Sequence, residues 1–138
     1  MTTAIIYWSG TGNTEAMAKA IESGMKEAGA QTALFSVEEV TPAVVDEYEK
    51  FAFGCPSMGS EELEQVKFEP FFAAIESRLS GKKVALFGSY GWGDGEWMRD
   101  WVERANAAGA LVYGEGLIQE LEPDEDACRE FGKGFAGF

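Results

Sequence analysis

A short turn of hydroxyl, amide and glycine residues follows the first apolar run of the sequence and could bind a phosphate group. The turn consists of Ser9, Gly10, Thr11, Gly12, Asn13 and Thr14. Glycine lets neighbouring backbone N–H groups converge on an anion, and the helix expected to begin near Asn13 adds the positive end of its dipole. The turn lacks the lysine of the triphosphate-binding loop, and its two glycines do not have the dinucleotide spacing. It therefore predicts a terminal phosphate monoester held by uncharged donors.

Two further loops are rich in glycine, serine and aromatic residues, namely Cys55 to Glu62 and Ser89 to Gly95. Trp92 stands between two glycines, which favours an exposed stacking wall for a flat ligand over an ordinary core position. Met58 has a flexible, polarisable side chain suited to the other face of a ring. Gly59 lacks a Cβ, so its backbone can reverse at little steric cost. Together with the phosphate turn, these loops predict a site for a ligand with a flat ring and a phosphate.

The elements expected around these loops alternate between apolar strands and amphipathic helices. Strands are expected at residues 4–8, 32–35, 51–55 and 83–88, with an interrupted last strand over 110–118. Helices are expected at 17–28, 42–47, 68–79, 97–105 and 128–135, with Trp97 and Trp101 on a core-facing stripe. Such an alternation predicts an α/β fold with a doubly wound parallel sheet. Ligands bind such sheets beyond the carboxyl ends of the strands, where all three loops would lie.

Composition and charge exclude several classes of function. The chain has 138 residues, with 24 acidic and 11 basic side chains and a formal net charge of -13, so neither nucleic acid nor an anionic membrane is an expected partner. Its two cysteines, Cys55 and Cys128, predict neither a disulfide framework nor a metal site, and the lack of histidine rules out serine–histidine and cysteine–histidine catalysis. No secretory signal is visible, so we expect a reduced, cytoplasmic protein whose chemistry is carried by a bound cofactor.

Three motifs in register resemble the short-chain flavodoxins of the clostridial type. They are the phosphate turn, the segment Met58-Gly59-Ser60-Glu61, and the segment Ser89-Tyr90-Gly91-Trp92-Gly93-Asp94-Gly95. The resemblance covers essentially the whole chain. It implies one flavodoxin-like FMN-binding domain over residues 1–138, with five parallel strands in the order 2-1-3-4-5 inside a three-layer sandwich.

The resemblance also implies how FMN would be held. The phosphate would lie on Ser9, Thr11, Asn13 and Thr14, and the ring would lie between Met58 and Trp92 with main-chain contacts from Gly91 to Gly93. Glu61 matches a carboxylate that accepts a hydrogen bond from flavin N3–H, and the peptide between Met58 and Gly59 could turn its carbonyl toward N5. Pro56 stands where some relatives have a serine, so one hydroxyl and one N–H are missing there. The full expected set is Ser9, Gly10, Thr11, Gly12, Asn13, Thr14, Pro56, Ser57, Met58, Gly59, Glu61, Ser89, Tyr90, Gly91, Trp92 and Gly93.

The function expected from these features is low-potential, one-electron transport between redox enzymes by non-covalently bound FMN. We expect a monomer without a catalytic site of its own, whose acidic loop at Glu61, Glu62 and Glu64 steers basic surfaces of redox partner proteins toward the ring. The alternative is an FMN-dependent NAD(P)H-quinone reductase of the same fold. A receiver-like signalling domain is disfavoured, because the third strand ends in Gly54 and Cys55 where a phosphoacceptor aspartate would be needed.

Overall fold

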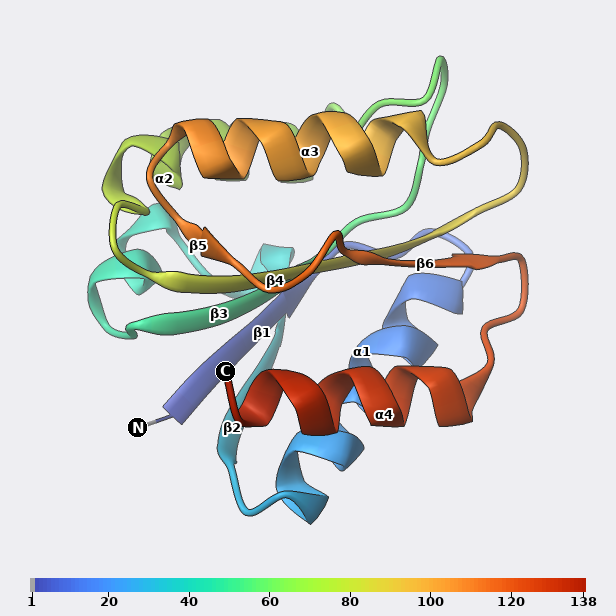
Figure 1. Ribbon diagram of the computed structural model, residues 1–138. Helices are drawn as coiled ribbons and strands as arrows, with labels where there is room; N and C mark the ends of the chain where they lie inside the picture. Colours follow the sequence, from blue (N-terminus) through green and yellow to red (C-terminus); the bar gives the residue numbers. More distant parts are fainter. Residues whose placement is uncertain (1) are drawn as a thin grey trace.

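Figure 1 shows a computed structural model of the chain, which describes residues 2–138 as a sheet between two layers of helices. The strands are β1 (Thr2–Tyr7), β2 (Gln31–Ser36), β3 (Lys50–Gly54), β4 (Lys83–Tyr90), β5 (Leu111–Val112) and β6 (Leu117–Glu120). The α-helices are α1 (Asn13–Glu27), α2 (Phe68–Ile75), α3 (Glu96–Ala107) and α4 (Glu125–Ala136), and short 3-10 helices lie at Val37–Glu39, Pro42–Asp46 and Glu76–Arg78. No helix within residues 2–138 is long and apolar enough to cross a membrane.

The strands run parallel in the order β2-β1-β3-β4-β5, which confirms the expected topology. The last strand is divided as expected: β5 and β6 both pair with β4, and the segment between them contains Gly114 and Gly116 with φ of 60° and 82°. Because β1 lies between β2 and β3, the order of the strands reverses there. The carboxyl ends of β1 and β3 therefore form the switch point at which this kind of sheet binds ligands.

The remaining elements agree with the expected ones in type and differ in extent. The segment 42–47, expected to be a short helix, forms a helix of the 3-10 type at Pro42–Asp46. The α-helix expected over 68–79 ends at Ile75, and the chain continues as the 3-10 helix Glu76–Arg78. The strand β4 extends two residues beyond the expected end and reaches Tyr90. This extension lets β6 pair with Ser89 and Tyr90, so it joins the end of the chain to the loop that follows β4.

Each face of the sheet has its own apolar core. In Figure 1, α2 and α3 lie above the sheet and α1 and α4 lie below it. The upper core is aromatic: Phe68 and Phe72 of α2 meet the Trp101 ring of α3 edge-on, at centroid distances of 5.5 and 5.7 Å. Trp97 and Trp101 are each 2 % exposed, which confirms that they belong to the core.

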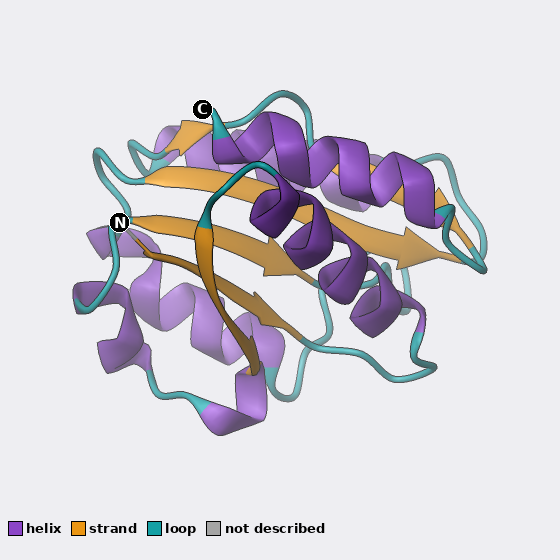
Figure 2. Ribbon diagram, turned by 90° about the horizontal axis from the view of Figure 1, so that it is seen from below, coloured by secondary structure: helices purple, strands orange, loops and turns teal. Residues whose placement is uncertain are grey.

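The lower layer depends on close packing of α1 against α4, which lie side by side in Figure 2. Two glycines make the approach possible, one on each helix. A Cβ on Gly24 would overlap the main-chain carbonyl of Arg129, and a Cβ on Gly132 would overlap that of Ile21. Main-chain atoms in regular helices cannot move aside as a flexible side chain can, so both positions must stay without a side chain.

The substitution Gly132→Ala should therefore lower the free energy of unfolding by about 1–3 kcal/mol, since the new methyl group must push the two helices apart. Urea unfolding followed by circular dichroism measures the change. Gly137→Ala is the control, because the nearest atom beyond its chain neighbours, the Gly134 carbonyl oxygen, is 3.8 Å from the new Cβ. A Gly132→Ala protein as stable as the Gly137→Ala protein would contradict this account of the helix contact.

Candidate cofactor site

The phosphate turn lies between β1 and α1, where the structure leaves several backbone donors free. The Ser9 hydroxyl oxygen accepts hydrogen bonds from the N–H groups of Gly12 (3.1 Å) and Glu15 (3.2 Å) and so closes the turn. Gly12 has a φ of 97°, which a residue with a side chain would adopt only under strain. Within residues 2–138, the N–H groups of Thr11, Asn13 and Thr14 have no hydrogen-bond partner. The beginning of α1 therefore presents three amides to an anion.

The side chain of Thr14 makes a contact that was not expected from the sequence. It is 1 % exposed, and its hydroxyl lies 2.8 Å from the hydroxyl of Ser89, at the end of β4. The Ser89 N–H also points at the Thr14 oxygen, at 3.4 Å. The pair ties the phosphate turn to the loop after β4, and the Thr14 backbone amide remains available to a ligand.

The second loop is a tight hairpin. Met58 and Glu62 exchange two main-chain hydrogen bonds, from Met58 N–H to Glu62 C=O (2.8 Å) and from Glu62 N–H to Met58 C=O (2.9 Å). The Met58 carbonyl is therefore already bonded, so the expectation that the Met58–Gly59 peptide turns it toward N5 is wrong for this structure. The Gly59 carbonyl has no partner among the described residues, which makes the Gly59–Ser60 peptide the one that is free to turn. Gly59 has a φ of 53°.

The third loop meets the hairpin through the side chain of Glu61. The Glu61 carboxylate lies 3.4 Å from the N–H groups of both Asp94 and Trp97, at the beginning of α3. A Cβ on Gly93 would overlap this carboxylate unless the Glu61 side chain shifted, and the φ of 88° at Gly93 itself favours glycine. Trp92 is 60 % exposed, which agrees with an indole that lies outside the core. The hairpin and the third loop thus form one continuous rim.

A cavity of about 200 Å³ opens where the three loops meet. It is lined by Gly10, Thr11, Asn13, Pro56, Ser57, Met58, Ser89, Tyr90 and Gly91, all from the expected set. Ser9, Gly12, Thr14, Gly59, Glu61, Trp92 and Gly93 are not among its lining residues and support it from the turn or the rim. The structure therefore gathers the three motifs around one hollow at the carboxyl ends of β1, β3 and β4.

Two residues that line the cavity are missing from the expected set, Trp8 and Leu121. Trp8 ends the first apolar run, and its ring packs close to Gly10, where an added Cβ would be 2.9 Å from it. Because Trp8 directly precedes the turn, its position in the sequence could have indicated that it lines the cavity. Leu121 comes from the far end of the chain, with a φ of 55° and an N–H that donates to Tyr90 C=O at 2.8 Å. Only the pairing of β6 with β4 places it there, so no local pattern indicates it.

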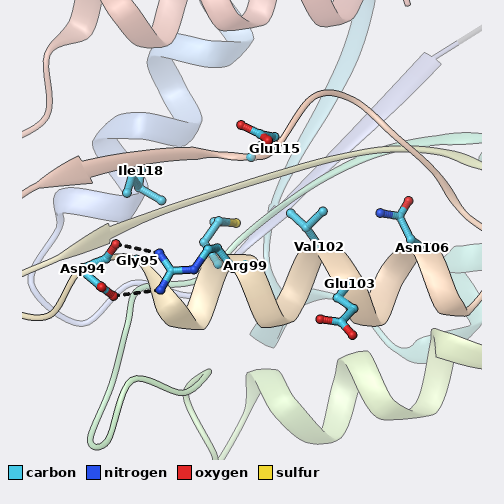
Figure 3. A pocket seen from close by; sticks show the side chains of 10 residues that line it. Asp94, Gly95, Arg99, Val102, Glu103, Asn106, Glu115 and Ile118 are labelled. Carbon is cyan, nitrogen blue, oxygen red and sulfur yellow. Dashed lines mark hydrogen bonds and ion pairs between the residues drawn. The ribbon is translucent and has the colours of Figure 1, made fainter.

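A second cavity, of about 570 Å³, lies beyond the third loop, between α3 and the segment that joins β5 to β6 (Figure 3). Met98, Val102 and Ile118 contribute apolar surface, and Glu103 and Glu115 add acidic side chains. Arg99 and Asp94 are already bonded to each other, through two hydrogen bonds of 3.0 Å each. None of the expected cofactor-binding residues is among its lining residues.

Both cysteine thiols are buried and act as structural groups. Cys55 follows β3 at the base of the hairpin loop, and its sulfur accepts a hydrogen bond from the Glu64 N–H at 3.3 Å. Burial raises the pKa of the Cys55 thiol far above its usual value, and burial together with Asp124 raises the pKa of Cys128 to about 11. Neither thiol is therefore a candidate nucleophile at neutral pH.

Comparison with known proteins gives one consistent result. The family model described as Flavodoxin matches residues 5–132. The chain is 50% identical to the flavodoxin of Clostridium beijerinckii over 134 residues, which covers 96% of this chain and 97% of the relative. It is 48% identical to the flavodoxin of Megasphaera elsdenii over 132 residues, 96% of each chain. The solution structure of two-electron reduced Megasphaera elsdenii flavodoxin superposes with a TM-score of 0.90 at 47% identity and covers 99% of both chains.

Thiol reactivity tests the burial of the two cysteines. At pH 8 the folded protein should react with a thiol-specific disulfide reagent only as fast as it opens, and both thiols should react at once in urea. The variant Cys128→Ser isolates Cys55. Raising the pH toward 10 should accelerate Cys128 more than Cys55, because the pKa of Cys128 is the less strongly raised. A fast reaction of the folded Cys128→Ser variant at pH 8 would contradict the placement of Cys55.

Proposed function

The chain belongs to the flavodoxin family, and from this membership we propose how its residues hold the cofactor and tune it. It is an electron carrier that works with FMN, not an enzyme with its own substrate. The flavin supplies the redox chemistry when it is bound. The observation that carries the proposal is the meeting of three loops around one cavity at the switch point of the sheet. The chain acts as a single FMN-binding domain.

The phosphate turn fits a dianionic monoester. The amides of Thr11, Asn13 and Thr14 have no partner among the described residues, and the start of α1 would bring the positive end of its helix dipole to the phosphate. The Ser9 oxygen already accepts two hydrogen bonds, so its own proton is left to donate to the ligand. The side chains of Thr11 and Asn13 line the cavity and complete a set of uncharged donors.

The rim of the cavity fits a flat ring. Met58 is 39 % exposed and Trp92 is 60 % exposed, and a ring placed between them would cover apolar surface that otherwise faces water. Glu61 lies against Gly93 with long contacts of 3.4 Å to two amides, which leaves its carboxylate able to accept a hydrogen bond from the ring edge. The free Gly59 carbonyl would accept a hydrogen bond from an N–H group at N5.

Charge around the site favours a low potential and one-electron steps. The turn, the hairpin loop and the third loop contain no lysine, arginine or histidine, whereas Glu61, Glu62 and Asp94 stand at the rim. Extra negative charge on the ring would meet these carboxylates and the poorly solvating side chains of Met58 and Trp92, which disfavours it. The residues present thus make a second electron harder to add than the first.

The acidic rim also indicates what kind of surface a redox partner protein would present to this chain. Glu62 and Asp94 are exposed beside the opening of the cavity, in a protein with a net charge of -13. Such a field steers basic surfaces of redox proteins toward the exposed edge of the ring and raises the association rate. We place the monomeric carrier in the cytoplasm, and the two free, buried cysteines support a reducing compartment.

The purified protein should be yellow and should release FMN, not FAD, when denatured in acid. Asn13→Ala removes a cavity-lining amide and should raise the FMN dissociation constant by about tenfold, the equivalent of one good hydrogen bond. Asn106→Ala, which removes the exposed amide side chain of α3 far from the turn, should leave the constant unchanged. Fluorescence titration measures both constants. A colourless protein that also ignores added FMN would falsify the proposed function.

The backbone at Gly59 provides a second test. A β-branched residue in the left-handed region costs about 1–2 kcal/mol, so Gly59→Thr should weaken FMN binding and shift the midpoint potential. Asparagine tolerates this region better, so Gly59→Asn should stay close to the original protein. Apart from the chain neighbours of Gly59, the nearest described atom to the added Cβ is Glu62 Oε1 at 3.5 Å, which makes the comparison one of conformation and not of space. Equal effects of threonine and asparagine would show that the left-handed turn is unimportant.

A further inference from the structure

Glu64 is a buried acidic residue that does not line the cofactor cavity. Its side chain is 5 % exposed and lies just before α2. One carboxylate oxygen accepts hydrogen bonds from the N–H groups of Lys67 and Phe68, both at 2.8 Å, and the other accepts from Val66 N–H at 2.9 Å. Burying a carboxylate is costly unless donors surround it, and the unpaired amides at the start of a helix supply them here.

The main chain of Glu64 is attached in a second direction. Its N–H donates to the sulfur of Cys55 at 3.3 Å, and the N–H of Cys55 donates to Phe87 C=O of β4 at 3.0 Å. The Cys55 carbonyl in turn accepts a hydrogen bond from the indole N–H of Trp97 at 3.2 Å. Glu64 therefore joins the end of the hairpin loop both to α2 and to the central strands of the sheet.

The hairpin lies between this anchor and a second one. On the other side, Ser57 N–H donates to Ser89 C=O at 3.0 Å. The paired residues Met58 and Glu62 follow, with two main-chain hydrogen bonds between them. Within residues 2–138, the main chain of the tip, residues 59–61, makes no hydrogen bond. Both ends of the loop are thus fixed by hydrogen bonds, and only the tip is free to change conformation.

We propose that Glu64 is a positioning residue for the cofactor. Its carboxylate fixes the end of the hairpin loop that follows Glu62, and so confines rearrangement to Gly59, Ser60 and Glu61. This inference rests on the proposed function, in which the hairpin contacts the flavin. Glu64 acts only through the hairpin, because its own side chain faces α2. A glutamine cannot replace it, since its single amide oxygen cannot serve all three donors and its NH₂ group would face an N–H group.

Hydrogen exchange on the FMN-bound protein tests the anchor directly. In Glu64→Gln, exchange of the amides of Val66, Lys67, Phe68, Met58 and Glu62 should be at least about tenfold faster than in the original protein. The FMN dissociation constant should rise by about tenfold, and the midpoint potential should shift, because the end of the loop that supports the tip is no longer fixed. Glu64→Ala should strengthen all three effects.

Glu62→Gln is the matched control. It removes the same charge from the same loop, but the Glu62 side chain is exposed and makes no hydrogen bond or ion pair among the described residues. A shift of the potential common to both variants would measure charge alone. A positioning role requires that only Glu64→Gln accelerates exchange at Met58 and Glu62. If exchange accelerates at Val66, Lys67 and Phe68 but stays unchanged at Met58 and Glu62, Glu64 merely caps α2 and the proposal is overturned.

The readouts separate this proposal from the proposed function. An original protein that binds no FMN would refute the function, and exchange at Met58 and Glu62 would then be compared between the original protein and Glu64→Gln without FMN, which still tests the anchor. An FMN-bound Glu64→Gln protein with unchanged exchange, affinity and potential would refute the anchor and leave the function untouched.

Discussion

Parallel pairing of β1, β3 and β4 brings the ends of these strands to one edge of the sheet, and the whole site depends on that constraint. The hydrogen bonds that continue beyond the strands extend it into the loops. Trp8 N–H donates to Gly54 C=O, Cys55 N–H to Phe87 C=O, and Ser57 N–H to Ser89 C=O, each at 3.0 Å. The loops therefore leave the sheet already in register with one another. A cofactor that spans all three needs no large rearrangement to be held, which reduces the conformational entropy lost on binding.

Side chains then link the loops where the backbone no longer does. The hydroxyl pair of Thr14 and Ser89 joins the phosphate end to the loop after β4, and Glu61 joins the hairpin to the beginning of α3. The first link is buried and short, whereas the second is long and half exposed. The phosphate end is therefore the rigid part of the site and the rim is the adjustable part. This distribution suits a carrier, because the anchor must stay fixed while the surroundings of the ring change with its charge.

The sequence predicted the parts of this arrangement that depend on local pattern. Apolar runs and helical spacing gave the alternation of strands and helices, the burial of Trp97 and Trp101, and the three loops that meet at the cavity, and the resemblance to the flavodoxins gave the strand order. It did not predict features that depend on pairing between distant segments. Leu121 reaches the cavity only because β6 pairs with β4, and the hydroxyl of Thr14 turns to Ser89 across 75 residues of sequence. The sequence also could not show that the Met58 carbonyl is already hydrogen-bonded, since its bond to Glu62 follows from the geometry of the hairpin.

The electrostatics of the site follow from which groups are absent as much as from which are present. In the proposed site a phosphate dianion would be held by amides and hydroxyls in a turn without a cation, so specificity would come from the directions of the donors instead of from net charge. Because the three loops contain no lysine or arginine, the carboxylates of Glu61 and Glu62 would act on the ring with little compensation from within the loops. Arg99, the nearest cation along the third loop, is tied to Asp94 and removes only part of the charge of the rim. In the proposed function the same acidic rim disfavours negative charge on the flavin and attracts basic partners, so tuning and docking would have one physical origin.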